Sequence, residues 1–261
     1  MLKSENGFVV ENLLISALNN KKVKELNDNL KEMLEKLFGD IDEDEIVECE
    51  KFKGFFKPDI VITYQGNKKY VSVKSGNAVT VHEEQLSTFV SFLHKTGFSK
   101  EALDTVKLYQ YGDGTTDGTG EKRMNWREVY EKYADKIKKA NIEFNRDKMK
   151  VYKVMDRLLF QGVDVEAIQA DAIYHGDVDN GVLVTKDSVD GYFAFKEWNQ
   201  YDALHIGPFF LKPHSRFVGV PDDRIKNEHL RHKIQINWSN MKADMLYIDK
   251  YFSSKKKRSI Y

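Results

Sequence analysis

One segment constrains the fold of this chain more than any other: two short runs rich in β-branched and aromatic residues that flank Gly66-Asn67. Such runs favour strands, and a glycine at the first central position suits a two-residue type II′ turn. Residues 57–76 are therefore predicted to form a β-hairpin. A turn at Gly66-Asn67 also fixes the register, because paired residue numbers then sum to a constant, and it predicts that Asp59 faces Lys74.

Alternation along the hairpin divides its residues between two faces. The apolar face is expected to lie against the core and consists of Ile60, Ile62, Tyr64, Val71 and Val73. The polar face consists of Asp59, Val61, Thr63, Tyr70, Ser72 and Lys74. Opposed residues have Cβ atoms about 5 Å apart, so Asp59 and Lys74 are predicted to lie close enough to share a metal ion, a water or a phosphate.

Pro58-Asp59 followed by Ser72-Val73-Lys74 resembles the motif of the PD-(D/E)xK nuclease superfamily. In that family an Asp at the start of one strand and an acidic-X-Lys triplet on the next build a magnesium site. Ser72 stands at the acidic position. This departure is shared with type II restriction endonucleases of the Ser-Val-Lys subgroup, which take their second carboxylate from the following helix. The resemblance covers roughly the first hundred residues.

The resemblance implies a fold and a mechanism. The fold is an α/β (α+β) restriction-endonuclease-like mixed central sheet flanked by helices, with an α+β C-terminal DNA-reading region. The implied cofactor is Mg²⁺, one ion or two, held by Asp59, the Val73 carbonyl and a second acid. Lys74 orients the attacking water and offsets charge on the phosphate, and Ser72 completes the catalytic set.

The second acid has several candidates. A helix is expected over 82–94, and Glu84 near its start is the first choice, with Glu83 next and His82 in the same turn. Both acids could instead only complement the helix dipole. Glu11, in an expected N-terminal helix, could support the site or be a solvated helix charge, and Glu48, in an expected strand, could approach the metal or face water.

Other elements follow from apolar periodicity and turn signals. Two helices are expected within 7–37, a strand over 46–52, a strand over 106–111, and helices over 126–137 and 145–160. Strands are expected over 181–184 and within 204–220, and a helix over 240–250.

A glycine-rich run, 112–120, suggests two regions: a catalytic core, 1–115, and a C-terminal DNA-recognition region, 121–261. Residues 1–120 contain 15 Lys, no Arg and 20 Asp+Glu, and the remainder contains 26 Lys+Arg and 21 Asp+Glu, so a net charge of −5 is followed by +5. Every arginine lies at or beyond Arg123. Arginine is well shaped to grip phosphates and guanine edges, which favours DNA contacts in the second region.

The best single candidate for base recognition is an expected strand over 231–238. Alternation puts a row of donors on one face and apolar side chains on the other. The donors are Arg231, Lys233, Gln235 and Asn237, and Arg216 could join them. The competing interpretation is an ordinary strand with a solvated polar face.

Composition excludes several other classes. The single cysteine, Cys49, allows no internal disulfide, is expected to be a small buried residue rather than a nucleophile, and forms no zinc motif with the seven scattered histidines. No apolar run approaches membrane-spanning length, and no secretion signal is recognised, so a cytoplasmic protein without a membrane partner is expected.

These observations predict a Mg²⁺-dependent, sequence-specific endonuclease of double-stranded DNA, like the enzymes of restriction-modification systems, acting as a homodimer or higher homo-oligomer. Two alternatives stay open. One is a structure-specific repair or junction-resolving nuclease on the same scaffold. The other is a non-catalytic DNA-binding module on a decayed nuclease fold, which Ser72 makes possible. The recognition sequence and the cleavage position are not specified by these patterns.

Overall fold

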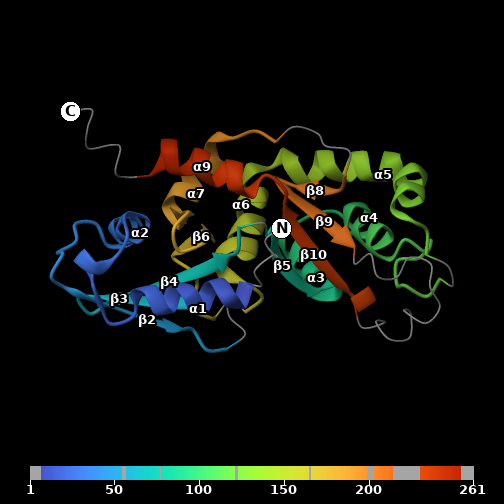
Figure 1. Cartoon of the computed structure of the whole chain (residues 1–261). Helices are drawn as coiled ribbons and strands as arrows, with labels where there is room; N and C mark the ends of the chain where they lie inside the picture. The colour runs from blue at the N-terminus through green and yellow to red at the C-terminus, as the bar shows by residue number, and fades with distance from the viewer. Residues whose placement is uncertain are drawn as a thin grey trace. The chain divides into compact units, whose positions relative to one another are not determined.

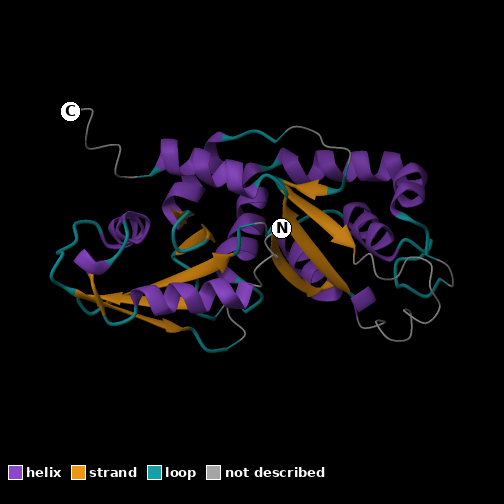
Figure 2. Cartoon of the chain, in the orientation of Figure 1, coloured by secondary structure: helices purple, strands orange, loops and turns teal. Residues whose placement is uncertain are grey.

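The computed structural model describes residues 7–54, 57–76, 78–120, 123–164, 166–198, 203–213 and 230–253. The chain divides into two compact units, each built on its own β-sheet (Figures 1 and 2). Unit 1 comprises Met1–Ala78, Asp156–Lys196 and Asn240–Tyr261, and unit 2 comprises Val79–Met155 and Glu197–Ser239. Each unit therefore contains segments from both of the regions that the glycine-rich run separates.

Unit 1 contains a six-stranded mixed sheet in the order β1-β2-β3-β4-β6-β7. Only β4 and β6 run parallel, and the other neighbours are antiparallel. The strands are β1 (Lys21–Lys22), β2 (Ile46–Lys51), β3 (Ile60–Tyr64), β4 (Asn67–Lys74), β6 (Ala172–Gly176) and β7 (Gly181–Thr185). The helical elements are α1 (Gly7–Leu18), η1 (Val23–Glu25), α2 (Asp28–Phe38), the π-helical turn η2 (Arg157–Gln161), α7 (Lys186–Phe195) and α9 (Met241–Phe252). The predicted mixed sheet flanked by helices is confirmed.

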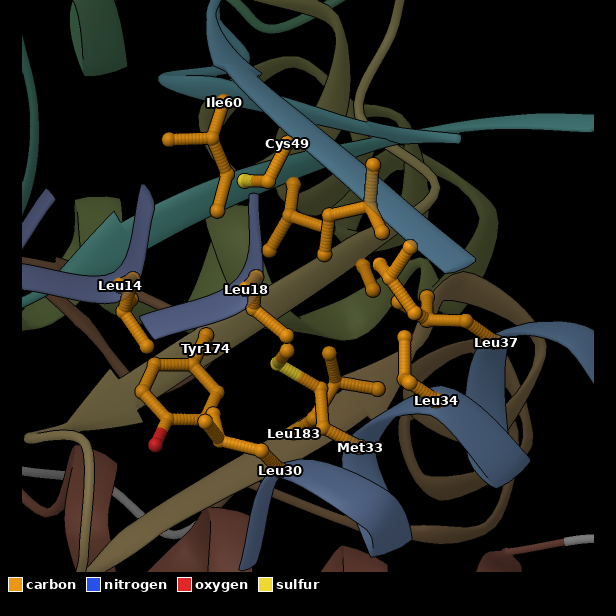
Figure 3. Packing of buried hydrophobic residues seen from close by; sticks show 14 of the residues in the cluster. Leu14, Leu18, Leu30, Met33, Leu34, Leu37, Cys49, Ile60, Tyr174 and Leu183 are labelled. Carbon is orange, nitrogen blue, oxygen red and sulfur yellow. The ribbon is translucent and has the colours of Figure 1, made fainter. Parts of the chain in front are cut away.

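The core of unit 1 forms where α1 and α2 pack on the apolar face of this sheet (Figure 3). The predicted apolar face of the hairpin is confirmed, because all five of its residues belong to this core: Ile60, Ile62, Tyr64, Val71 and Val73. Cys49 lies in the same core as expected, and burial, with the nearby Glu50 charge, raises the pKa of its thiol to about 12. Each fully buried valine, leucine, isoleucine or methionine of this core contributes roughly 1.5–3 kcal/mol to the free energy of unfolding.

Local signals explain why α2 forms where it does. The Asn27 side chain accepts a hydrogen bond from the Leu30 amide and caps the helix start, and Gly39, with φ of 86°, ends it. Leu30, Met33, Leu34 and Leu37 recur at helical spacing and are buried (Figure 3). The two helices predicted within 7–37 are thus confirmed.

Unit 2 contains a four-stranded antiparallel sheet in the order β5-β10-β9-β8. Its strands are β5 (Thr80–Gln85), β8 (His205–Ile206), β9 (Phe209–Pro213) and β10 (Lys233–Trp238). Its helices are α3 (Leu86–Thr96), α4 (Lys100–Tyr111), α5 (Trp126–Arg146) and α6 (Lys148–Asp156), whose last residue begins the next segment of unit 1. The predicted alternation in β10 is confirmed, because Ile234, Ile236 and Trp238 are fully buried.

The strand predicted over 106–111 is wrong, because this segment is the second half of α4. The Ser99 side chain accepts from the Ala102 amide and starts the helix, and Gly112, in the left-handed region, ends it. Valine and tyrosine suit strands when considered alone, but burial at helical spacing overrides that weak preference.

The remaining elements agree with expectation to different degrees. The strands over 46–52 and 181–184 and the helix over 240–250 are confirmed within a few residues. The helix predicted over 126–137 continues to Arg146 with a kink at Tyr133, and the one over 145–160 is α6 followed by η2. Within 204–220 the structure has β8 and β9, and residues 214–220 lie outside the described part. Among the described helices, none is long and apolar enough to cross a membrane.

Candidate active site

Asp59 is held in a defined orientation where β3 begins. Its amide donates to the Val71 carbonyl at 2.9 Å, and its carbonyl accepts from the Phe52 amide at 3.0 Å. Its carboxylate oxygen Oδ2 accepts from Ser72 Oγ at 3.1 Å and from the Val73 amide at 2.6 Å. In the described part of the chain no hydrogen bond reaches the second oxygen, Oδ1, and the residue is half-buried. The carboxylate therefore has one fixed oxygen and one that can accept a cation or a water.

The hairpin is confirmed, but its turn is not the predicted one. The central residues are Gln65 and Gly66, which both have positive φ, 47° and 75°. Two positive φ angles are the requirement of a type I′ turn, which matches the twist of antiparallel strands. Tyr64 consequently pairs with Asn67, two positions from the predicted pairing.

The changed register moves Asp59 relative to Lys74. A shift of two residues keeps every side chain on its own face, so the composition of the polar face is unchanged. Asp59, however, binds Ser72 rather than lying directly opposite Lys74, as the predicted turn required. Lys74 lies two residues beyond Ser72 on the same face, at the end of β4, and its ammonium group has no hydrogen-bond partner or counterion within the described ranges.

A histidine that the sequence analysis missed lies beside Lys74. Strands β4 and β6 are parallel, and the register pairs Lys74 with His175 on the same face of the sheet. His175 is buried, and burial lowers the pKa of its imidazole, as does the charge of Lys242, while a hydrogen bond with the Ala78 backbone opposes this shift. His175 is thus favoured as a neutral neighbour of Lys74. No local pattern identifies it, because the pairing joins segments about a hundred residues apart in sequence.

Glu11 forms an ion pair with Lys51 at the same end of the sheet as Asp59. It is buried on α1, and its Oε2 accepts from Lys51 Nζ at 3.0 Å. Lys51 Nζ also lies 3.7 Å from the centroid of the Phe8 ring. Lys51 pairs with Ile60, the residue after Asp59, so this ion pair lies close to the start of β3.

Glu48 is exposed on β2, where it pairs with Thr63. Its side chain lies on the polar face of the sheet, as Thr63 does. The structure therefore places it toward water.

The helix predicted over 82–94 is present but begins later than predicted, at Leu86. His82, Glu83 and Glu84 instead lie on strand β5 of unit 2. Alternation places His82 and Glu84 on the face that carries Ile234 and Ile236, and both are buried. Their side chains form a hydrogen bond of 3.1 Å between Nε2 and Oε1. Glu83 and Glu84 precede Gln85, the N-cap of α3, so neither lies within the first turn of that helix, where the dipole interpretation placed them.

The proposed base-reading side chains of β10 are engaged within unit 2. Glu83 is exposed and accepts from Lys233 Nζ at 3.4 Å and from Gln235 Nε2 at 3.1 Å. Asn237 is buried, and its Oδ1 accepts from Thr80 Oγ1 at 2.9 Å. Strand β10 is flanked by β5 on one side and β9 on the other, so it is a central strand of this sheet.

Arg231 precedes β10 rather than forming part of it. Its guanidinium Nη2 binds Asp113 Oδ2 and donates to the Gly120 carbonyl at 3.2 Å. Asp113 also accepts from the Thr115 and Gly120 amides, so Arg231 and the glycine-rich loop share one buried carboxylate. This loop is a folded part of unit 2. Arg216 lies outside the described residues.

The oxygen donors of unit 1 fit a hard cation. No group of three or more His, Cys, Asp or Glu side chains within the described ranges is arranged to hold a metal ion. The donors available at the hairpin are the Asp59 carboxylate and the Val73 carbonyl. Mg²⁺ is commonly held by one or two carboxylates and keeps several waters, so a site with few protein oxygen donors is compatible with this ion.

A search of solved structures found a similar chain, the restriction endonuclease MspI in complex with its cognate DNA. The alignment covers 88% of this chain and 88% of that chain, with 12% sequence identity and a TM-score of 0.45. No protein-family model matches the sequence, and a search of curated proteins found no match. At this level of similarity, an account of activity depends on the residues of the chain itself.

Proposed function

We propose that this protein is a Mg²⁺-dependent endonuclease that hydrolyses phosphodiester bonds in double-stranded DNA, with its active site at Asp59, Ser72 and Lys74. One observation carries the proposal. Asp59 has one carboxylate oxygen fixed by Ser72 and the Val73 amide, and its other oxygen has no partner in the described part of the chain. The same face of the sheet ends in Lys74.

Each residue has a separate task. Mg²⁺, when bound, polarises the phosphoryl group and stabilises charge on the leaving oxygen. Asp59 and the Val73 carbonyl would hold the cation, and Lys74 would direct its ammonium donors at the attacking water or a phosphate oxygen. Ser72 is buried and donates its hydroxyl to Asp59, so it is a positioning residue in the place where the family motif has an acid.

The test is cleavage of a supercoiled plasmid in Mg²⁺, compared with EDTA. Asp59→Asn keeps the acceptor for Ser72 but removes the charge that binds the cation, so it should abolish cleavage. Lys74→Ala should do the same, whereas Lys68→Ala should cut like the wild type. Lys68 is the matched control because it is exposed, on the same strand and on the same face. Wild-type cutting by Asp59→Asn or by Lys74→Ala would contradict the proposal.

We further propose that the cleavage is sequence-specific, as it is in the enzymes of restriction-modification systems. Sequencing the plasmid ends decides it, because a sequence-specific homodimer leaves one defined end sequence on both strands. One observation favours a structure-specific nuclease instead: Lys233 and Gln235 contact Glu83 of unit 2, and these contacts would have to be exchanged for contacts with bases. Ends at many sequences, together with preferential cutting of branched DNA, would support that second candidate.

A further inference from the structure

Unit 2 contains a cavity of about 410 Å³ that no step of the proposed hydrolysis uses. It lies between the end of α4, the start of α5 and strands β9 and β10. Figure 1 shows these elements as neighbours within this unit. Cavities of roughly 300–1,000 Å³ are typical of small-molecule sites.

Aromatic rings form much of the lining. Tyr109 and Phe210 line the cavity and are half-buried, and Trp126, the first residue of α5, lines it while remaining 72% exposed. The Arg127 guanidinium lies 5.2 Å from the centroid of the Trp126 ring. An exposed indole at the edge of a cavity offers a stacking surface for a planar ligand.

A buried amide adds hydrogen-bonding specificity. Asn237 lines the cavity and is only 8% exposed. Its Oδ1 accepts from Thr80 Oγ1 at 2.9 Å, which leaves Nδ2 to donate, and no hydrogen bond from Nδ2 is formed within the described ranges. Nδ2 is not among the fully buried polar atoms that lack a partner, so it faces accessible space in the cavity and can donate to an acceptor atom on a ligand.

The lining is cationic. Arg123 and Lys212 line the cavity, and no Asp or Glu of the described chain does so. Arg123 donates to the Gln110 carbonyl at 2.9 Å. Burial and the nearby charge of Arg231 lower the pKa of Arg123 to about 10, so it stays protonated at neutral pH. A ligand that is planar, rich in acceptor atoms and negatively charged would match these walls.

We propose that this cavity binds one nucleobase of a nucleic acid, unstacked from its neighbours, with the base against Trp126, an acceptor atom of the base at Asn237 Nδ2, and the adjoining phosphate near Arg123 and Lys212. The proposal rests on the proposed function in one respect, namely that the ligand is a nucleic acid. Enzymes that carry out chemistry on a DNA base take it out of the stack into a pocket where aromatic or apolar side chains stack on it, and asparagine can pair with the edge of adenine.

Binding is measured by calorimetry in EDTA, so that no cleavage occurs, with two probes: adenosine 5′-monophosphate and a short single-stranded oligonucleotide. Trp126→Ala should weaken binding of both probes by roughly tenfold, as expected for the loss of one base-stacking contact. Asn237→Asp keeps the shape and the acceptor for Thr80 but removes the free donor, so it should weaken binding similarly. Phe195→Ala should have no effect, because Phe195 is an exposed aromatic residue of unit 1.

The outcomes separate this proposal from that of the active site. Asp59→Asn should bind adenosine 5′-monophosphate like the wild type while losing cleavage. The cavity proposal alone would be overturned if the wild-type protein cuts DNA but binds adenosine 5′-monophosphate no better than the Trp126→Ala variant does. The proposal of hydrolysis alone would be overturned if the wild-type protein binds the nucleotide through Trp126 and Asn237 but never cuts DNA.

Discussion

The backbone amide of Val73 donates a hydrogen bond of 2.6 Å to Oδ2 of Asp59, so one strand of the hairpin orients a carboxylate on the other. Ser72 Oγ reaches the same oxygen at 3.1 Å. Hydrogen bonds to a carboxylate are stronger than those between neutral groups, and two of them restrict its rotation. A serine at the acidic position of the motif therefore has a structural purpose: it supports the acid that remains.

Ser72→Ala should reduce Mg²⁺-dependent cleavage without abolishing it. The substitution removes one of the two hydrogen bonds to Asp59 and leaves the Val73 amide in place, a loss of about 1 kcal/mol, or roughly fivefold in rate. Single-turnover cleavage at several Mg²⁺ concentrations measures the effect, with Ser75→Ala, a half-buried serine just after β4, as control. A complete loss of activity would show that the hydroxyl takes part in the chemistry itself.

The free energy of unfolding should fall as the pH drops below about 6.5. Burial lowers the pKa of His175 and of His205 in the folded protein, so the unfolded chain binds protons at a pH where the folded one does not. Stability is therefore fully present above the unfolded pKa and is lost as the pH falls toward the folded values. Urea unfolding at pH 7.5, 6.5 and 5.5 measures the slope. The His175→Gln variant should show a smaller dependence of the free energy of unfolding on pH, whereas replacing the exposed His94 by Gln should leave it unchanged. Equal slopes in the wild type and both variants would exclude His175 as a cause of this dependence.

Arg231→Ala should destabilise the protein by about 3–5 kcal/mol, the cost of leaving one partner of a buried ion pair uncompensated. The Asp113 carboxylate has no exposed surface and joins Arg231 to the glycine-rich loop. Lys233→Ala is the matched control, because its pair with Glu83 is partly exposed and such pairs contribute about 0–1 kcal/mol. Urea unfolding of both variants provides the measurement. If Arg231→Ala unfolds like the wild type and loses only DNA binding, the residue reads DNA as the sequence pattern suggests.

The faces of the hairpin could be predicted because alternation depends only on the strand period. Its register could not, since Gly66 suits either central position of a two-residue turn and the sequence offers both Gln65-Gly66 and Gly66-Asn67. Strand β5 was mistaken for a helix because glutamate and glutamine are good helix formers and α3 follows directly. His175 could not be found at all, because its neighbour Lys74 lies on a strand that only the folded sheet brings beside it. Local patterns therefore predicted that Asp59, Ser72 and Lys74 share one face of the hairpin, but not which of them are in contact or what surrounds them.

Glu84 was the predicted second metal ligand, and its surroundings suggest a structural role that can be tested. Its side chain is 2% exposed and that of His82 is 7% exposed, and the two bind each other on the face that carries Ile234 and Ile236. Removing the carboxylate leaves a buried imidazole without this partner.

Glu84→Ala should therefore lower the free energy of unfolding by about 1–3 kcal/mol. Glu83→Ala, the exposed neighbour on the same strand, should change it by less than about 1 kcal/mol. Urea unfolding gives both values, and Mg²⁺ binding by calorimetry is measured on the same samples, where the structural role predicts unchanged affinity for Glu84→Ala. A stable Glu84→Ala protein with weakened Mg²⁺ binding would reverse the assignment and restore Glu84 as the relocated acid, because a lost carboxylate ligand acts on metal occupancy rather than on packing.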